Sequence, residues 1–448
     1  MRQYSHLVRH SGNLPLFQAV EMAATAISGG HPFHIHAEGV RGTGKTTVMR
    51  AARVILPPIR RIKGCCYNCD PACPHCPEHK HLTGAELAAV GTEVVPRPFL
   101  EISHGAKIGT VVGSIDLGKL IDRTQPTAAL LPGSILKAHC GVLFIDEVNR
   151  LADTAPELAD VLLDVMGTKP GRIQVEETGL PTVEMPVTVS VWAASNPDEE
   201  PGALARVRKQ LADRFDLVVN MGRPGDYQSV QDILAQADGK AALETVYTLP
   251  AADFRQVAVG EAIRAILAAV YVDFGLESLR GVEAIETAAR LAAAKACRQT
   301  VEVQDMIQVV PLALGHRTDA ATLTAILRYL HSIAGDPGGR LIRPRLDLPG
   351  ETTGPASSDG KKSMATSSWW QRFSERLRGS RRTPPAENTV DQKKPARQQA
   401  AGSNAGGSGE TVADPMKTEI IAPPQVASSL VDLPLERYVS AEASQPHE

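Results

Sequence analysis

The sequence has no run of eighteen apolar residues, and its N-terminal stretch MRQYSHLVRHSGNLP lacks the apolar centre of a secretory signal peptide. We therefore expect no transmembrane segment and take the cytoplasm as the default compartment. The 448 residues carry a formal net charge of only −3, so no basic excess points to nucleic acid. A hydrophobic share of 43% is that of a globular protein with a sizeable core.

Cysteine is also scarce, and most of it lies in one place. Five of the seven cysteines fall in the segment GCCYNCDPACPHCPEHKH, between Gly64 and His81, whereas Cys140 and Cys297 stand alone. In a reducing compartment such clustering favours metal binding or thiol redox chemistry over a framework of structural disulfides.

The first half of the sequence has the pattern of an α/β domain. Residues 31–225 alternate short apolar runs with longer amphipathic ones, which is typical of βαβ units on a parallel sheet. The segments 33–39, 141–147 and 187–196 read as strands, and each ends where small or polar residues begin. We therefore predict an α/β domain over residues 1–225.

Two later parts of the sequence have different compositions. Residues 226–335 show helical periodicity rich in Ala and Leu, as in 284–298 and 321–333, which predicts a small all-helical domain. Residues 336–448 are dominated by Pro, Gly, Ser and Gln, lack a D-x-S-x-S motif and are expected to be disordered. Within them, 367–379 has the spacing of a basic amphipathic helix. It either docks on a partner or an anionic membrane surface or forms only transiently.

A glycine-rich motif predicts a nucleotide site. The segment GVRGTGKT satisfies the pattern G-x-x-x-x-G-K-[ST] and lies between a predicted strand and a predicted helix. Its glycines let backbone N–H groups turn inward around phosphate oxygens at a helix N-terminus. Lys45 can reach the β- and γ-phosphates, and the Thr46 hydroxyl can ligate Mg²⁺. The expected nucleotide-binding residues are Gly39, Gly42, Thr43, Gly44, Lys45, Thr46, Thr47 and Asp146.

A pair of acids about a hundred residues later supplies groups that the loop lacks. The apolar segment VLFIDE predicts a buried strand that ends in Asp146, placed to hold Mg²⁺, and Glu147, placed to polarise an attacking water. The alternative, that both acids only cap the next helix, is disfavoured by the upstream loop. Asn196 ends another predicted strand and could position the same water, although Asn is also a common turn residue there.

Two arginines are candidates for contact with the γ-phosphate. Arg214, in RKQLADRFDLVV, could act as a finger on the nucleotide of a neighbouring subunit. Its plain alternative is a surface ion pair with Asp213 or Asp216. Arg280 begins a helix of the second domain and could close onto the same nucleotide, although most arginines at helix starts have no such role.

In this order, the motifs resemble those of an AAA+ ATPase and, more closely, of the ATPase (I) subunit of magnesium chelatase. The likeness rests on GCCYNCDP, VGSIDLGKL, AHCGVLFIDEVNRL, LLDVM and NPDEEPGALARVRKQLADRFDL, covers residues 15–330 and includes an insertion at about 109–135. It implies ATP and Mg²⁺ as cofactors, a helical lid, and a homo-oligomeric ring, expected to be a hexamer. It also implies an integrin-like D-type partner and a porphyrin-binding H-type partner, which together insert Mg²⁺ into protoporphyrin IX for chlorophyll biosynthesis.

Three other functions compete with this one. A MoxR-like AAA+ protein would mature or remodel a client together with an integrin-like partner. A nucleic-acid translocase is disfavoured because the expected hairpin at 171–187 carries Glu176, Glu177 and Glu184 against a single Arg172. A nucleotide-bound scaffold without turnover is disfavoured by the intact acid pair and arginine finger.

Only part of the cysteine cluster belongs to the family pattern, namely Cys65 and Cys69. Four thiolates from Cys65, Cys69, Cys73 and Cys76 could surround Zn²⁺ at about 2.3 Å, with Cys66 in place of Cys65 or a histidine in place of one cysteine. Alternatively, one thiol pair forms a redox-sensitive disulfide that alters ATPase activity. The third interpretation is a reduced, partly exposed loop with neither role.

Overall fold

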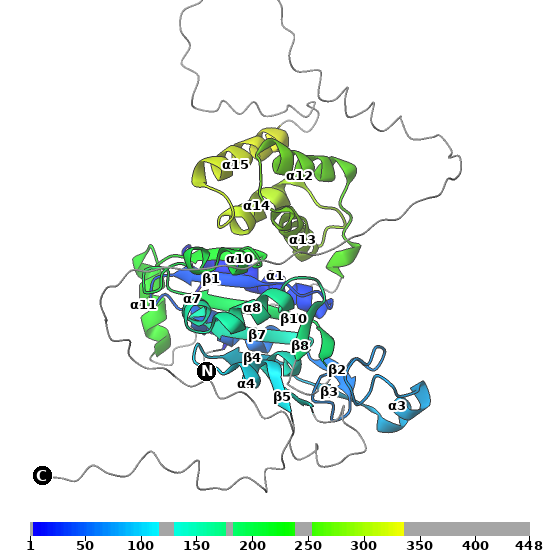
Figure 1. The fold of residues 1–448 in the computed structure, drawn as a ribbon. Coiled ribbons are helices and arrows are strands. Elements are labelled where there is room, and N and C mark those ends of the chain that lie inside the picture. Colours follow the sequence, from blue (N-terminus) through cyan, green and yellow to red (C-terminus); the bar gives the residue numbers. More distant parts are fainter. Residues whose placement is uncertain (1–2, 116–129, 176–181, 238–252, 336–448) are drawn as a thin grey trace, which may run out of the picture. The chain divides into compact units, whose positions relative to one another are not determined.

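The structure, a computed structural model, describes residues 3–115, 130–175, 182–237 and 253–335 (Figure 1). The expected disordered tail at 336–448, with the amphipathic helix at 367–379, lies outside the described residues. So do Glu176 and Glu177 of the expected hairpin and residues 116–129 of the expected insertion.

A five-stranded parallel sheet forms the centre of the α/β region. Its strand order is β11-β1-β10-β7-β4, and all four neighbouring pairs are parallel. The middle strands are almost entirely buried, as expected for a parallel sheet that is covered on both faces. The strands are β1 (Ile35–Gly39), β4 (Phe99–Ile102), β7 (Gly141–Asp146), β10 (Val189–Ser195) and β11 (Leu217–Met221).

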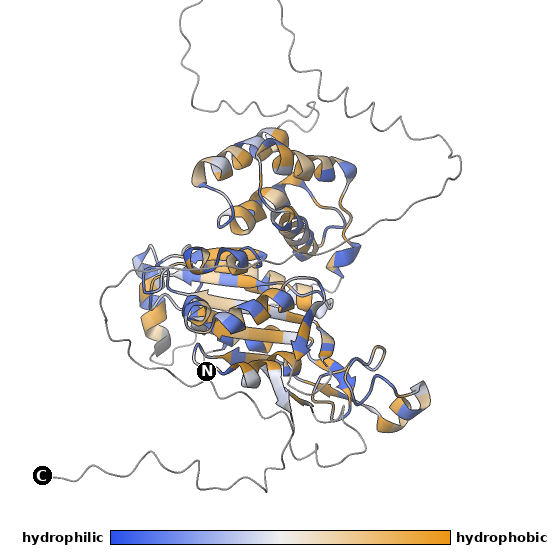
Figure 2. Ribbon diagram, in the orientation of Figure 1, coloured by the Kyte–Doolittle hydropathy of each residue, from blue (hydrophilic) through white to orange (hydrophobic). Residues whose placement is uncertain are grey.

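Successive residues of the strands enter two different cores, because side chains alternate between the faces of a sheet. Phe144 and Trp192 pack with α1 and α2, whereas Leu143 and Ile145 pack with α7 and α8. Figure 2 shows the strands as predominantly hydrophobic ribbons. The covering helices are α1 (Leu14–Ser28), α2 (Lys45–Ala51), α7 (Val148–Thr154) and α8 (Pro156–Val165).

In the part of the chain that the structure describes, three antiparallel strand pairs accompany the sheet. They are β2 (Ile59–Ile62) with β3 (Thr92–Val95), β5 (Gly113–Ile115) with β6 (Leu130–Pro132), and β8 (Gly171–Val175) with β9 (Val183–Val187). The last pair lies where the sequence predicts a hairpin, with Gly171 opposite Val187. The first pair was not predicted, and it encloses the cysteine-rich segment and α3 (Gly84–Val90).

The remaining short helices connect these elements. They are η1 (Tyr4–His6), η2 (Ala52–Ile55), α4 (Ile108–Val112), α6 (Ser134–Lys137), α9 (Leu204–Val207), α10 (Lys209–Ala212), α11 (Tyr227–Ala237) and η4 (Phe254–Gln256). Among the described residues, no helix is both long and apolar enough to cross a membrane.

Four longer helices form the C-terminal part of the described chain. Buried alanines lie along one face of α13, which lets α14 pack closely against it. Lys295 of α13 forms an ion pair with the buried Glu21 of α1, so the helical part contacts the α/β region directly. The helices are α12 (Glu261–Asp273), α13 (Leu279–Lys295), α14 (Val303–Leu314) and α15 (Ala320–Gly335).

Candidate functional site

The phosphate loop joins the end of β1 to the start of α2. Gly42 and Gly44 have φ angles of 78° and 90°, in the left-handed region where a side chain is costly. These two turns bring the loop backbone around to the N-terminus of α2, where N–H groups are free of helical partners and attract anions. The local fold is therefore that of a phosphate-binding loop.

Lys45 lies at the centre of this loop and is only 6% exposed. Its ammonium group donates hydrogen bonds to the carbonyl oxygens of Gly39 at 2.6 Å and Val40 at 2.9 Å. It also donates to Oδ1 of Asn196 at 2.9 Å, although Lys45 begins α2 and Asn196 directly follows β10. Burial lowers the pKa of Lys45, while the negative charge of Asp146 opposes that shift. The structure thus brings the loop lysine and the predicted asparagine together.

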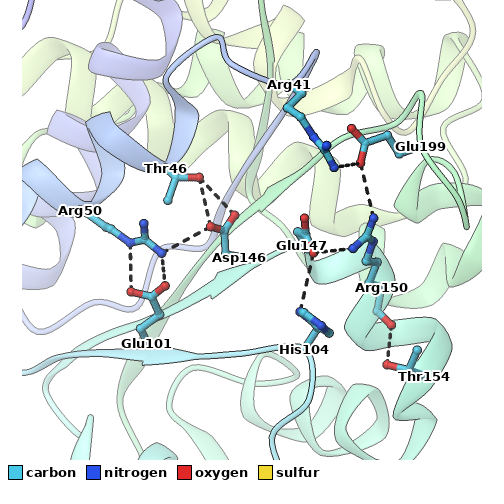
Figure 3. A network of polar contacts seen from close by, with 10 residues as sticks. All are labelled: Arg41, Thr46, Arg50, Glu101, His104, Asp146, Glu147, Arg150, Thr154 and Glu199. Atoms are coloured by element: carbon cyan, nitrogen blue, oxygen red, sulfur yellow. Dashed lines mark hydrogen bonds and ion pairs between the residues drawn. The ribbon is translucent and has the colours of Figure 1, made fainter.

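Thr46 and Asp146 face each other across the cleft (Figure 3). The Thr46 hydroxyl is 3.2 Å from both carboxylate oxygens of Asp146. Hydroxyl and carboxylate oxygens are the hard ligands that Mg²⁺ prefers, so this pair fits the metal of a nucleotide complex. Arg50 of α2 lies 3.5 Å from Asp146 and also pairs with Glu101, which orients the Asp146 carboxylate.

Glu147 has an unusual backbone. It follows β7 with φ 56° and ψ 49°, the left-handed conformation that non-glycine residues rarely adopt. Such a conformation costs about 1–3 kcal/mol and is retained mainly at functional sites. The Glu147 carboxylate lies 3.1 Å from Arg150 and 3.7 Å from His104 (Figure 3). In this structure, therefore, its charge is balanced by basic groups beside the cleft.

A cavity of about 350 Å³ connects these groups. Of the predicted nucleotide-binding residues, Gly39 and Thr43 do not line it. Gly39 instead accepts the hydrogen bond from Lys45, and the Thr43 hydroxyl donates to the carbonyl of Val40 at 2.8 Å. The lining residues are Arg41, Gly42, Gly44, Lys45, Thr46, Thr47, Asp146, Glu147, Ser195 and Asn196.

The two predicted arginines lie elsewhere. Arg214 and Arg280 both line a second cavity of about 360 Å³, together with Lys169 and Arg317, and this cavity shares no lining residue with the phosphate cleft. In this structure Arg280 does not reach the phosphate cleft, and its contact with the nucleotide stays a prediction. The physical reason is that α13 presents Arg280 to the loops before β11, where Asp213 accepts its hydrogen bond at 3.2 Å.

The plain alternative for Arg214 also finds no support in the ion pairs around it. Asp213 pairs with Arg280 and with Arg317, the latter at 3.0 Å, and Asp216 pairs with Lys169 at 2.8 Å. Partial burial lowers the pKa of Arg214, and the charge of Arg280 lowers it further. Three guanidinium groups, those of Arg214, Arg280 and Arg317, thus line one cavity together with the carboxylates of Asp216 and Glu283.

Several charged residues around Glu147 were not predicted from the sequence. Glu199 accepts from Arg41 at 2.7 Å and lies 3.5 Å from Arg150, so these three link the phosphate loop to α7 (Figure 3). Arg150 had a local signal, because it is three residues after Glu147 on a helix. His104 and Glu199 had no such sequence signal, because they reach the cleft from segments that are distant from Glu147 in the sequence.

The cysteine loop, residues 63–82, corrects the expected ligand set. Cys65, Cys69 and Cys76 are fully buried and lie together, as predicted, but Cys73 is exposed and outside the group. The fourth member of the group is His79. Cys73 is turned away because its backbone forms a bridge with Asp70 in a tight turn.

Comparisons with known proteins agree with this geometry. The sequence matches the family model of magnesium chelatase subunit ChlI over residues 12–201 and the AAA lid domain over residues 264–326. The chloroplastic magnesium-chelatase subunit ChlI-2 of Arabidopsis thaliana is 30% identical, with 62% of this chain and 68% of that protein covered. The magnesium-chelatase 38 kDa subunit of Acidiphilium rubrum is 33% identical, with 62% and 81% covered. The chain belongs to the family of magnesium-chelatase ATPase subunits.

A solved complex between subunits BchI and BchD of magnesium chelatase contains a chain 25% identical to this one. The TM-score is 0.41, and 72% of this chain and 98% of that chain are covered.

As a member of the magnesium-chelatase ATPase subunit family, the chain is an AAA+ ATPase. The match to the ChlI subunit contains the phosphate loop, both acids and Asn196, and the match to the lid contains Arg280. Arg214 lies between the two matches. The predicted fold class, an AAA+ α/β core with a parallel sheet followed by a helical lid, is confirmed.

Proposed function

We propose that the chain is the ATP-hydrolysing motor subunit of a magnesium-chelatase-type complex, in which partner subunits insert Mg²⁺ into protoporphyrin IX for chlorophyll biosynthesis. One observation carries the proposal. The magnesium-chelatase 38 kDa subunit of Acidiphilium rubrum is 33% identical over 81% of its length, and the match to the ChlI family over residues 12–201 contains every residue that lines the phosphate cleft.

The residues of the cleft divide the work of hydrolysis. Lys45 places a positive charge at the phosphates, and Thr46 with Asp146 would hold the Mg²⁺ that neutralises developing charge on them. Asn196, bonded to Lys45, fixes the far side of the cleft at the end of β10. Among the described residues that line the cleft, Glu147 is the only acid besides Asp146, which makes it the candidate to orient and activate the attacking water.

The positions of Arg214 and Arg280 favour a ring. Each lies at a cavity separate from the phosphate cleft, so in a single chain neither guanidinium contacts the site of hydrolysis. A head-to-tail ring of identical subunits brings one surface of each chain against a different surface of the next. We assign both arginines to the γ-phosphate held by a neighbouring subunit, in a ring expected to be a hexamer.

The reaction explains the need for a motor. Mg²⁺ loses its water reluctantly and prefers oxygen ligands, so its transfer into a ring of porphyrin nitrogens is unfavourable without coupled work. In the proposed complex, an H-type subunit binds the porphyrin and an integrin-like D-type subunit connects it to the ring. Conformational change driven by ATP hydrolysis supplies the work.

Reconstitution tests the proposal. The purified full chain is mixed with the D-type and H-type subunits of the same organism, protoporphyrin IX, Mg²⁺ and ATP, and the fluorescence of Mg-protoporphyrin is followed. Product should form only with ATP, and Glu147→Gln should bind ATP but form no product. ATP hydrolysis and binding of an integrin-like partner without any metal insertion would instead identify a MoxR-like maturation ATPase.

The same assay separates the motor from a nucleic-acid translocase. In the described part of the hairpin β8–β9, the single arginine, Arg172, is paired with Glu184 at 3.5 Å, which is poor chemistry for gripping phosphates. Turnover should therefore be unchanged when single-stranded DNA is added. A large stimulation by DNA would contradict the chelatase assignment.

A further inference from the structure

The cysteine loop holds a group of four side chains that the ATPase site does not use. The Sγ atoms of Cys65, Cys69 and Cys76 and one ring nitrogen of His79 all lie within 4.8 Å of one another. The three cysteines are fully buried and His79 is 9% exposed. Four metal-ligating atoms therefore converge on one point that water barely reaches.

The spacing of these atoms matches a shared metal ion better than a disulfide. Two thiolates at about 2.3 Å from one tetrahedral zinc lie roughly 3.8 Å apart. Cys65 Sγ and Cys76 Sγ are 4.0 Å apart, nearly twice the length of an S–S bond. Cys76 Sγ is 3.0 Å from Nδ1 of His79, whereas a thiolate and an imidazole bound to one tetrahedral zinc lie roughly 3.6 Å apart, so this pair would separate slightly around an ion.

The surrounding backbone is arranged to stabilise thiolate sulfur. The N–H groups of His75 and Cys76 both point at Cys69 Sγ, at 3.4 and 3.3 Å. Hydrogen bonds of this kind orient metal ligands and offset the negative charge of sulfur. Gly64 and Asn68 have φ angles of 74° and 53°, and these left-handed turns direct the residues that follow them, Cys65 and Cys69, inward.

The buried Cys65, Tyr67, Cys69 and Cys76 of the loop are part of the core that also contains residues of α7 and α8. Among its buried side chains, the large apolar one is Tyr67, while the others are cysteine, histidine and asparagine. Buried polar groups are costly unless they are bonded, and a structural metal ion would supply bonds to the sulfur and nitrogen atoms of this group. Four protein ligands leave no open position, so the ion would be structural rather than catalytic.

We propose that Cys65, Cys69, Cys76 and His79 form a tetrahedral structural Zn²⁺ site. The site fastens the cysteine loop to the segment that enters β7. On one side of the cysteine loop, the side-chain amide of Asn68 donates a hydrogen bond to the carbonyl oxygen of Lys137 at 2.7 Å. The ring of His75 packs on that of His139, with ring centres 4.1 Å apart. The proposal does not depend on the chelatase role of the complex.

Metal analysis of the full chain tests the site. Protein purified under reducing conditions without chelator should contain close to one zinc per chain. Substitution of Co²⁺ should give the intense visible absorption of a tetrahedral thiolate site. His79→Ala should lose the metal, whereas His79→Cys, which restores a fourth ligand, should keep it. Cys73→Ser is the matched control, because Cys73 lies in the same loop but outside the group, and it should retain full zinc content.

Three results would overturn the proposal. The first is reduced wild-type protein that is folded, binds ATP and contains no zinc. The second is a Cys65–Cys76 disulfide in that protein, detected by mass spectrometry after alkylation, which would show redox chemistry instead. The third is loss of zinc from Cys73→Ser with retention in His79→Ala, which would return the ligand set to four cysteines.

Discussion

The left-handed backbone of Glu147 predicts that two variants which lose activity alike differ in stability. Replacement by glycine or by alanine removes the same carboxylate and the same ion pair with Arg150. The two variants therefore differ only in the cost of φ 56°. A residue with a β-carbon pays about 1–2 kcal/mol there, whereas glycine pays about 0.5–1 kcal/mol of chain entropy on folding. Glu147→Gly should therefore be more stable than Glu147→Ala by about 1 kcal/mol.

This difference can be measured by thermal unfolding of the two variants side by side. A change of 1 kcal/mol corresponds to a difference of about 2–4 °C in Tm for a domain of this size. Both variants should lose ATP turnover by a factor of about 10²–10⁴, the usual contribution of a general base. Equal Tm values would show that the backbone of residue 147 is not strained. Normal turnover in either variant would remove Glu147 from the mechanism.

Three further predictions concern the cleft, the ring and the core. Lys45→Ala should weaken binding of a fluorescent ATP analogue at least about tenfold, whereas exposed Arg53→Ala should not; equal affinities would contradict the site. Lys45→Ala and Arg214→Ala should each fail to hydrolyse ATP alone. A 1:1 mixture of the two variants should recover roughly a quarter of wild-type activity, because each site is shared between two subunits. No recovery of activity would argue against action in trans. Burial lowers the pKa of His36 to about 3. Below pH 6.5 the unfolded chain therefore binds a proton at His36 that the folded chain does not bind, and the free energy of unfolding falls as the pH decreases. Between pH 7 and 5 this group costs up to about 2 kcal/mol, so denaturant unfolding of His36→Gln should be less sensitive to pH, and an identical pH dependence would refute the assignment.

The parts of the site that could be predicted are those in which the sequence itself sets the geometry. The phosphate loop is contiguous, and an acid pair at the end of an apolar strand points to the same sheet edge as the loop. The sequence assigns both Lys45 and Asn196 to the region of the γ-phosphate, but it does not predict the hydrogen bond between them across 151 residues.

Other contacts depend on features that a single sequence does not show. The strand order β11-β1-β10-β7-β4 decides that His104, just after β4, lies beside Glu147 at the end of β7. In the cysteine loop, the spacing allowed either Cys73 or His79 as a ligand. Burial decides between them, and burial depends on a turn at Asp70 and on packing against the segment before β7.

Asp213 connects the helical lid directly to the loop before β11. Its carboxylate accepts hydrogen bonds from Arg280 of α13 and from Arg317, which follows α14, and the next residue along the chain is Arg214. Because peptide bonds are stiff, a swing of the lid that pulls on Asp213 must also displace Arg214. If Arg214 reaches into the next subunit's cleft, the orientation of one subunit's lid controls the rate of ATP hydrolysis in its neighbour. The order in which the subunits of a ring hydrolyse ATP would then be set by this mechanical coupling.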